Sequence, residues 1–312
     1  MPAPAEPLAS VLDKVWQDQG RIGFLLPASD EIEMRQVEDP ISAVPFRFRW
    51  LPHRELRSDL AELEARGIVS ADRSETELFR DPRDPPGRFC FLCADNIRSS
   101  NPKEELVPLR LAGHGYYAGA NFAWIAEGHF TVMAAEHRDQ EFTDHTLAAM
   151  LDLHAQAGGE YRVIYNAPHA GATIPWHLHL QTSKEPFPVE DLPDGFEDRY
   201  PTALRRFSSG AGPALDFVAD WGRRNTAHHR VNVLVAGPPA SPIIHVFPRD
   251  TRRSHAAAKG LMGGFEVCGD FVYSEADKRA AFEAASAELA RSILEEIRPG
   301  VTPARTRRRS RG

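Results

Sequence analysis

The stretch Pro175-Trp-His-Leu-His-Leu-Gln181 alternates apolar and polar side chains, and this period of two predicts a β-strand. Successive strand residues point to opposite faces, so His177, His179 and Gln181 are expected on one face. Two imidazoles and an amide in this position can be metal ligands, a nucleophile with its neighbours, or ordinary polar groups on a solvated sheet. Motifs elsewhere in the sequence are needed to distinguish these alternatives.

The composition is that of an ordinary globular protein. The chain has 312 residues, of which 42% are hydrophobic and 26% charged, which suits one large or two moderate domains. It contains no run of eighteen apolar residues, and its start, MPAPAEPLAS, lacks the basic-then-apolar order of a signal peptide. Three cysteines are too few for a disulfide framework. We therefore expect a soluble, cytoplasmic protein without a membrane partner.

The charge of the chain argues against general nucleic-acid binding, because its formal net value is -7. The exception is the end, where five of the last eight residues are arginine. Such a segment can bind RNA, anionic lipid or a protein partner, but it is more often a solvated terminus. Residues 301–312 are therefore expected to form a basic, disordered tail.

The hydrophobic pattern predicts strands and helices in both halves of the chain. Helices are predicted over 8–19, 56–67 and 144–159, and strands over 22–28, 46–52, 89–93, 122–137, 161–168 and 175–181. After a polar connector (182–201), strands over 230–237 and 242–249 are expected to pair, and a final helix begins at Ser274 and ends at Pro299. An α+β protein of two similar halves is expected.

The cysteine pair Cys90-Phe-Leu-Cys93 has a spacing that lets both sulfurs reach one metal ion from a tight turn. A redox pair is the alternative, but such a pair belongs at the start of a helix, and the following residues do not predict one. A metal site needs two further ligands. His137 and His177 are candidates, because both lie at ends of predicted strands.

Three segments resemble a known family when they are taken in order: RFCFLCADNIR (88–98), EGHFTVMAAEHRDQ (127–140) and YNAPHAGATIPWHLHLQ (165–181). They are similar to the galactose-1-phosphate uridylyltransferase-like branch of the histidine-triad superfamily, which includes diadenosine tetraphosphate and GDP-sugar phosphorylases. The resemblance covers residues 86–183 well and the second half weakly. It implies two HIT-like halves, each an antiparallel sheet packed with helices, over 1–190 and 191–300, followed by the tail.

The resemblance implies a closed Cys₂His₂ zinc site made by Cys90, Cys93, His137 and His177, with a structural role. It also implies that His179 is the catalytic nucleophile. This agrees with chemistry, because a neutral imidazole nitrogen can attack a phosphorus atom and split a difficult transfer into two easier steps. The other ring nitrogen must then be held by an acceptor, typically a main-chain carbonyl.

Gln181 takes the place of the third histidine of histidine-triad hydrolases, and transferases of this branch carry glutamine there. An amide can donate to a phosphate oxygen but has no titratable proton, so a bound nucleotide is expected to wait for an acceptor. Asn166, Gly171 and Thr173 match the family's α-phosphate cradle, in which glycine lets main-chain N–H groups approach the anion. Arg249 is a further candidate for a phosphate, with Arg252 and Arg253 nearby in sequence.

Two departures from the family pattern reduce the set of expected metals and acceptors. His245 lacks the partner of a His-x-His pair because Ile243 precedes it, so a second metal is doubtful. Val272 stands where the uridylyltransferases have a glutamine that holds the hexose phosphate, although Glu266 is retained. Galactose 1-phosphate is therefore disfavoured as an acceptor.

The expected function is a nucleotidyltransferase, with a phosphorylase favoured. Its donor would be a dinucleoside polyphosphate or NDP-sugar, cleaved by inorganic phosphate through a nucleotidyl-histidine. The alternatives are a hexose-1-phosphate nucleotidylyltransferase, a nucleotide hydrolase and an inactive zinc- or nucleotide-binding module. The expected partners are the nucleotide donor and phosphate or a phosphorylated acceptor, with a monomer or homodimer and no nucleic acid.

Overall fold

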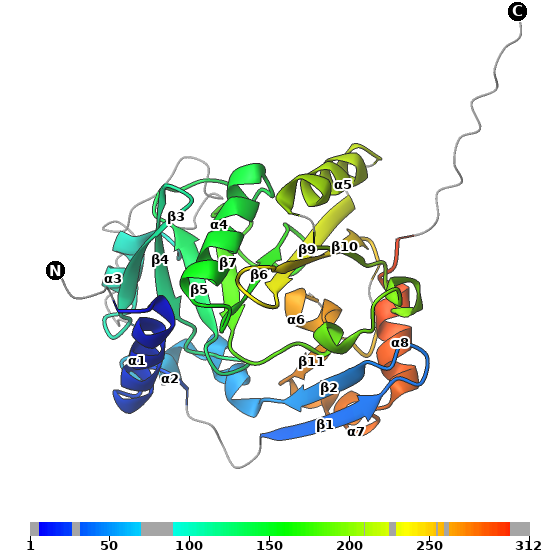
Figure 1. Cartoon of the computed structure of the whole chain (residues 1–312). Helices are drawn as coiled ribbons and strands as arrows, with labels where there is room; N and C mark the ends of the chain where they lie inside the picture. The colour runs from blue at the N-terminus through cyan, green and yellow to red at the C-terminus, as the bar shows by residue number, and fades with distance from the viewer. Residues whose placement is uncertain are drawn as a thin grey trace, which may run out of the picture.

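Two β-sheets and a layer of helices make up the protein, as seen in a computed structural model (Figure 1). The structure describes residues 6–26, 32–69, 90–208, 210–224, 229–253, 255–258 and 262–299. The proline-rich stretch at 80–88 and the basic tail lie outside these residues. None of the described helices is long and apolar enough to cross a membrane.

The large sheet has eight strands, all paired antiparallel, in the order β3-β4-β5-β7-β6-β9-β10-β8. They are β3 (Leu106–Leu111), β4 (His114–Ala120), β5 (Phe130–Ala134), β6 (Arg162–Asn166), β7 (His179–Ser183), β8 (Arg205–Phe207), β9 (His229–Ala236) and β10 (Ile243–Asp250). The small sheet joins β1 (Glu33–Glu38), β2 (Pro45–Trp50) and β11 (Asp270–Tyr273), with β11 parallel to β2.

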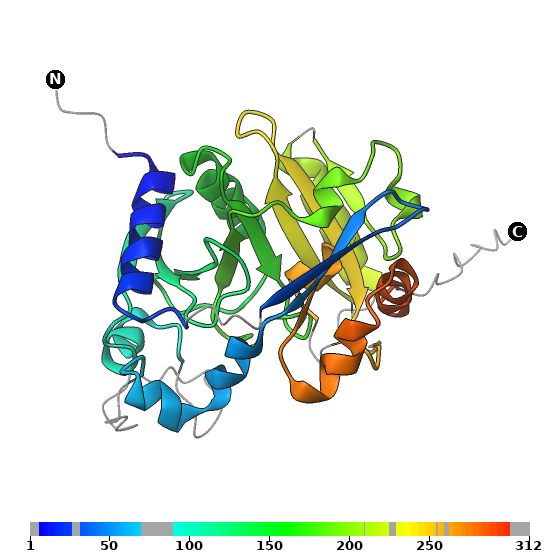
Figure 2. The ribbon, with the colours of Figure 1, turned by 90° about the horizontal axis from the view of Figure 1, so that it is seen from below.

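The helices lie around these sheets. The α-helices are α1 (Leu8–Arg21), α2 (Leu60–Ala65), α3 (Ala94–Ser100), α4 (Asp144–Gln156), α5 (Ala211–Arg224), α6 (Gly264–Val267), α7 (Arg279–Glu283) and α8 (Ala287–Glu296). The 3-10 helices are η1 (Pro52–Ser58), η2 (Pro188–Asp191), η3 (Glu197–Arg199) and η4 (Ala276–Lys278). Helices α4 and α5 pack on one face of the large sheet, and β1 and β2 cross the opposite side (Figures 1 and 2).

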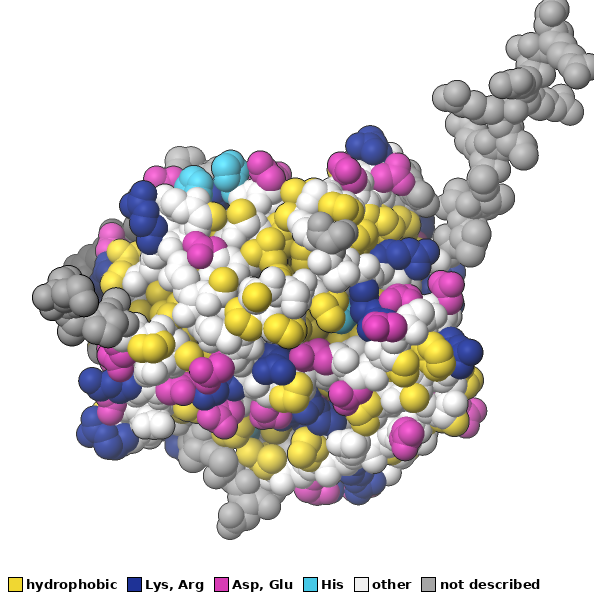
Figure 3. Space-filling model, viewed as in Figure 1, with side chains coloured by type: hydrophobic (Ala, Val, Ile, Leu, Met, Phe, Trp, Pro, Cys, Tyr) yellow, Lys and Arg dark blue, Asp and Glu magenta, His cyan; other side chains and the backbone are white. Residues whose placement is uncertain are grey.

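Each face of the large sheet has its own hydrophobic core. Alternation along β6 separates them, because Val163 lies in the cluster under α4 whereas Ile164 lies in the cluster with the small sheet. The second cluster includes Phe48 and Phe271, whose rings stack with centroids 4.9 Å apart. On the outer surface, acidic and basic side chains are intermingled over the face shown in Figure 3.

The strand register of the large sheet aligns site residues on the sheet face opposite α4. Gly119, Thr131 and Gln181 are direct cross-strand partners on β4, β5 and β7, and Met133 pairs with His179 in the neighbouring row. Directly paired residues point to the same side of a sheet. This register creates a continuous row from β4 to the histidine-bearing strand.

The two halves share both sheets. Strand β6 of the first half pairs with β9 of the second, and β2 pairs with β11. The α+β class with antiparallel sheets packed with helices is confirmed. The division of the chain at residue 190 stays a prediction.

Several predicted elements are confirmed, including the helices at 8–19 and 144–159 and the paired strands at 230–237 and 242–249. The predicted strand at 89–93 is wrong for residues 90–93, which form a turn, and the predicted strand at 122–137 is limited to β5. The predicted strand at 22–28 is wrong for residues 22–26, which form a turn. Gly23 has a φ of 72° and ends α1, so Phe24 bonds back to the Gln19 carbonyl and enters the core.

The last predicted helix is interrupted. Ser274 does not begin it, because the chain forms η4 and α7 and then starts α8 at Ser286. The Ser286 side chain accepts a hydrogen bond from the Leu289 N–H, which is an N-cap contact. The predicted helix at 56–67 is likewise split into η1 and α2, although Gly67, with a φ of 65°, lies just beyond its end as predicted.

Candidate active site

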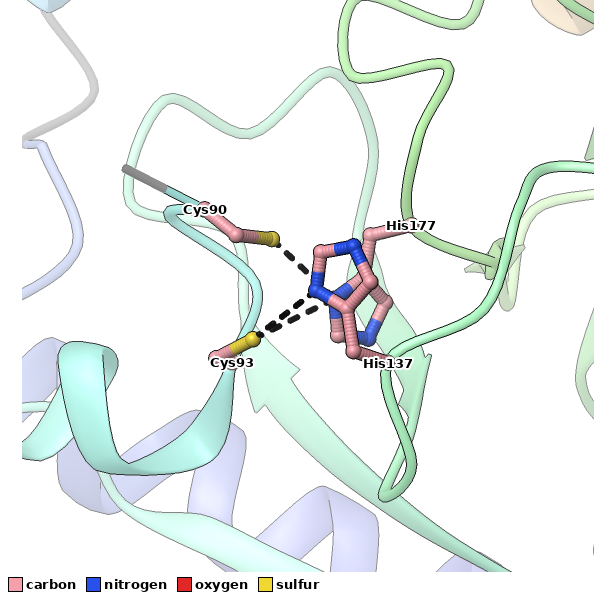
Figure 4. Close-up of side chains that lie close together, drawn as sticks. All are labelled: Cys90, Cys93, His137 and His177. Atoms are coloured by element: carbon pink, nitrogen blue, oxygen red, sulfur yellow. Dashed lines mark hydrogen bonds between the residues drawn. The ribbon is translucent and has the colours of Figure 1, made fainter. Parts of the chain in front are cut away.

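Four side chains from three separate segments form a cluster that can hold a metal ion (Figure 4). Cys90, Cys93, His137 and His177 each offer one ligand atom, and these atoms lie within 4.8 Å of one another. Cys90 Sγ is 3.1 Å from His177 Nδ1, and Cys93 Sγ is 3.2 Å from His137 Nδ1. Metal–sulfur and metal–nitrogen bonds of about 2.3 and 2.0 Å separate tetrahedral ligand atoms by about 3.5 Å, so the donor set fits one such ion.

The ligand orientations are fixed by neighbouring groups. His177 Nε2 donates to the Ala134 carbonyl at 2.9 Å, which leaves Nδ1 facing the cysteines. The hydrogen bond with Cys93 and the proximity of His177 lower the pKa of the Cys90 thiol. A thiolate is the form that binds metal.

A helix follows the second cysteine, contrary to the expectation from sequence. Cys93 is the N-cap of α3, and buried Asn96 donates to the Cys90 carbonyl at 2.8 Å, which closes the turn between the cysteines. The presence of α3 means that a redox pair is not excluded on the ground of a missing helix. A metal site is favoured because His137 and His177 approach the sulfurs to 3.1–3.7 Å.

His179 is the first residue of β7, so the strand is shorter than predicted and His177 lies in the turn before it. The His179 side chain is buried, and its Nδ1 donates to the His177 carbonyl at 2.9 Å. Gln140 holds the His179 main chain from both sides, at 2.7 and 2.9 Å. Burial lowers the pKa of His179 to about 4, which keeps the imidazole neutral.

Gln181 begins a chain of amide and guanidinium groups across four strands. Asn166 Nδ2 donates to Gln181 Oε1 at 3.3 Å, and Asn232 Nδ2 donates to Asn166 Oδ1 at 2.7 Å. Arg249 Nη1 then donates to Asn232 Oδ1 at 2.9 Å. Since the Gln181 side-chain oxygen accepts the hydrogen bond from Asn166, the Gln181 side-chain N–H groups can donate to another partner.

Gly171 lies where two loops from the two halves meet. Its φ is 107°, and a Cβ there would collide with the Gly263 main chain. Glycine is therefore required both for conformation and for close approach. Thr173, two residues on, is exposed.

These groups line one cavity of about 630 Å³. Among the predicted residues, the lining includes Asn166, Gly171, Thr173, His179 and Gln181. Arg249 is not among the lining residues; it is buried and donates to Asn232, which does not line the cavity either.

Arg54 lines the same cavity and was missed by the sequence reasoning. It is buried, its Nη1 donates to the Ala123 carbonyl, and its Nε has no hydrogen-bond partner among the described residues. Burial lowers its pKa to about 10, so it stays a cation at neutral pH. A lone arginine on a 3-10 helix has no periodic signal, and only its burial beside the cavity reveals it.

Among the other residues singled out from sequence, Glu266 lines the cavity, and four do not: Val272, His245, Arg252 and Arg253. Val272 is buried in the core of the small sheet, and His245 is buried on β10. Arg252 Nε bonds to Asp250 at 2.8 Å, and Arg253 donates to the Arg298 carbonyl.

Comparisons with known proteins support the fold. A family model described as "Domain of unknown function (DUF4922)" matches residues 74–184. No curated protein matches the chain by sequence. The crystal structure of yeast Ap4A phosphorylase Apa2 is similar with a TM-score of 0.62 and 17% identity, over 95% of this chain and 98% of that chain. The chain has the fold of Apa2.

Two ligand complexes of Apa2 show the same likeness. The complex with AMP has a TM-score of 0.58 and 17% identity, over 97% of this chain and 100% of that chain. The complex with Ap4A has a TM-score of 0.61 and 16% identity, over 95% and 98%. The fold expected from the three sequence segments is therefore confirmed along nearly the whole chain.

Proposed function

We propose that the protein is a nucleotidyltransferase that forms a covalent nucleotidyl-histidine on His179 and passes the nucleotide to inorganic phosphate. The observation that carries this proposal is the contact of His179 Nδ1 with the His177 carbonyl at 2.9 Å. Because a carbonyl only accepts, Nδ1 carries the proton and Nε2 has the free lone pair. That nitrogen belongs to a side chain that lines the cavity.

The reaction has two displacements. His179 Nε2 attacks the α-phosphorus of the donor, the Nε2–P bond forms, and the P–O bond to the leaving phosphate or polyphosphate breaks. An oxygen of inorganic phosphate then attacks the same phosphorus, the Nε2–P bond breaks, and a nucleoside diphosphate leaves. Nδ1 keeps its proton throughout. Gln181 N–H groups and main-chain N–H groups near Gly171 stabilise the charge on the phosphoryl oxygens.

A dinucleoside polyphosphate or NDP-sugar is the proposed donor. Apa2 was solved in complex with Ap4A, and this chain shares its fold. Arg54 offers a buried cation in the same cavity for a phosphate beyond the α-position. The hexose-1-phosphate alternative is weaker, because Val272 is buried in the core and offers no polar group.

We further propose that the ion held by Cys90, Cys93, His137 and His177 is zinc, since two thiolates and two imidazoles suit that metal. All four positions of a tetrahedron are filled by protein, so its role is structural. It holds the turn that carries the His177 carbonyl, which in turn orients His179.

Two alternatives remain to be separated by experiment. A hydrolase would transfer the nucleotide to water, which Gln181 disfavours because it has no proton to give. An inactive binding module needs no nucleophile, which the oriented imidazole of His179 disfavours.

The test is to incubate the protein with ADP-, GDP- and UDP-sugars and dinucleoside polyphosphates without phosphate, and to measure the intact mass. We expect a nucleotide adduct on wild-type protein that phosphate discharges as nucleoside diphosphate. His179→Ala should lose the adduct and at least about 10³-fold in rate, about 4 kcal/mol of barrier. Added imidazole should restore part of the rate of His179→Gly. Full activity in His179→Ala would refute the mechanism, and rapid discharge to water would indicate a hydrolase.

A further inference from the structure

We infer that Glu104, held by Asn101, contacts the nucleobase of the donor and makes the site specific for guanine. Glu104 and Asn101 both line the cavity that contains His179 and Gln181. The inference rests on the proposed function, because that function locates the α-phosphate beside His179.

The sheet register gives the distance between the two ends of the site. A Cβ at Gly119 would collide with Glu104 Oε1, so the carboxylate lies directly on the main chain of β4. Gly119 pairs with Thr131 and Thr131 pairs with Gln181, so two strand spacings, about 10 Å, separate the carboxylate from Gln181. A nucleoside monophosphate with its phosphate at Gln181 and His179 can extend its base to Glu104.

The surroundings of the base end are apolar. Several apolar residues line the cavity: Leu63, Val69, Leu92, Ile97 and Phe122. Phe91, which is 47% exposed, lines it as well. A cavity with apolar walls suits a nucleobase, which can stack on an aromatic ring while its edge reaches polar groups.

The Glu104 carboxylate lacks a counter-ion in the described part of the chain. Its only hydrogen bond from described residues is from Asn101 Nδ2 to Oε2, at 2.7 Å. Burial raises the pKa of Glu104 to about 7, with the Asn101 hydrogen bond opposing, and no charged neighbour contributes. A half-buried carboxylate without a cation is stabilised by a ligand that brings N–H donors.

Guanine is the base whose edge matches this pair. An ionised carboxylate only accepts hydrogen bonds, and guanine presents two adjacent donors, N1–H and the N2 amino group, beside the O6 acceptor. Adenine, cytosine and uracil do not have two adjacent donor groups on that edge. The second N–H of Asn101 Nδ2 is available for O6. The two carboxylate oxygens of Glu104 can then accept from N1–H and the N2 amino group, while Asn101 donates to O6, which complements the guanine edge.

The experiment measures the binding of GMP, IMP and AMP to full-length protein by calorimetry. IMP lacks the N2 amino group and differs from GMP in nothing else. We expect GMP to bind at least about tenfold more tightly than IMP, because a hydrogen bond to a charged group is lost, and more tightly still than AMP. Equal affinities for GMP and IMP, or a preference for AMP, would overturn the inference.

The variant Glu104→Gln should reduce the ratio of GMP to AMP affinity by at least about tenfold. The control is Glu105→Gln, since Glu105 is exposed on the same segment and does not line the cavity; it should keep the wild-type ratio. An unchanged ratio in a folded Glu104→Gln protein would contradict the inference. If that variant does not fold, the comparison of GMP with IMP on wild-type protein decides.

The two proposals fail differently. If AMP is bound or transferred as well as GMP, only the base assignment is wrong, and a nucleotide adduct still forms on His179. If no nucleoside monophosphate binds and no donor forms an adduct, the proposed function itself is wrong, and the base assignment falls with it.

Discussion

The imidazole of His179 is oriented by the main chain of the turn before its strand rather than by a carboxylate. Nδ1 bonds to the carbonyl two residues earlier, and Gln140 fixes the adjacent peptide groups. Side chains around the site can therefore vary without changing which ring nitrogen faces the phosphorus. This makes Gln181 a position where the fate of the nucleotide can be tested separately from its loading.

Replacement of Gln181 should separate these two steps. In Gln181→Ala the adduct should still form, but the missing hydrogen bond to the transferring phosphoryl group should cost about 2–4 kcal/mol of barrier. Gln181→His should shorten the lifetime of the adduct in the absence of phosphate, because a histidine can deliver and accept protons. Both effects are measurable by quenched-flow mass spectrometry. An adduct lifetime in Gln181→His equal to that of wild type would contradict this role.

Glu104 should make the free protein less stable as the pH rises from about 4.5 to about 7. Its folded pKa of about 7 lies above the ordinary value, so the unfolded chain releases this proton first. The folded state is therefore favoured at low pH, and the advantage is lost through this window. Subtracting the melting temperatures of Glu104→Gln from those of wild type at each pH isolates the effect. A difference that does not change with pH would contradict it.

Single residues show what can be predicted from sequence. Cys90, Cys93, His137 and His177 were singled out from the cysteine spacing and the resemblance, and the structure brings them together in one cluster. The roles of His179 and Gln181 come from the resemblance and stay predictions. Arg54 and Glu104 were missed because each is an isolated charged residue whose position depends on how η1 and β4 pack. Arg249 was a candidate for phosphate binding, and this stays a prediction. The structure shows it buried and bonded to Asn232, a position that sequence could not reveal.

At the level of elements, the cluster of Cys90, Cys93, His137 and His177 joins the turn before α3, the turn after β5 and the turn before β7. The sequence did not predict α3 because ADNIRSS combines poor helix formers with no apolar stripe. Tertiary contacts form it instead, with Asn96 bonded to the Cys90 carbonyl. The interruption of the C-terminal helix was not predicted either, because the apolar pattern continues across the break. The new N-cap at Ser286 is visible only in the structure.

Loss of one ligand should affect both stability and activity. Cys93→Ser should contain less than one zinc per chain and should melt at a lower temperature, because metal-binding energy is folding energy. The control is Cys268→Ala, since Cys268 is buried but outside the cluster, and it should keep its zinc. Elemental analysis and thermal melts check both variants. Active wild-type protein without zinc would contradict the assignment.

At the scale of the whole molecule, a group of ion pairs joins the strands of the small sheet and reaches the end of β7 in the large sheet. Asp270 of β11 accepts from Arg47 and Arg49 of β2, each at 2.8 Å, and Arg49 also reaches Glu185 after β7 at 2.6 Å. Asp270 and Arg49 are both buried. The group ties the end of the histidine-bearing strand to the small sheet.

Removal of Asp270 should therefore be costly. Asp270→Ala leaves two guanidinium groups without their shared carboxylate, and we expect the free energy of unfolding to fall by about 3–5 kcal/mol. The control is Glu62→Ala, which breaks an exposed pair with Arg66 and should cost at most about 0.5 kcal/mol. Urea titration measures both. Equal losses in the two variants would show that the buried pairs of Asp270 do not stabilise the small sheet.

The parallel pairing of β2 with β11 also constrains how the protein is made. Arg47 and Asp270 are 223 residues apart, so the β1–β2 hairpin leaves the ribosome long before the strand that completes its sheet. During that interval Phe46 and Phe48 have no Phe271 to cover them, and one edge of β2 offers unpaired main-chain groups. Until translation is almost complete, these rings and this strand edge are therefore open to contacts with other chains.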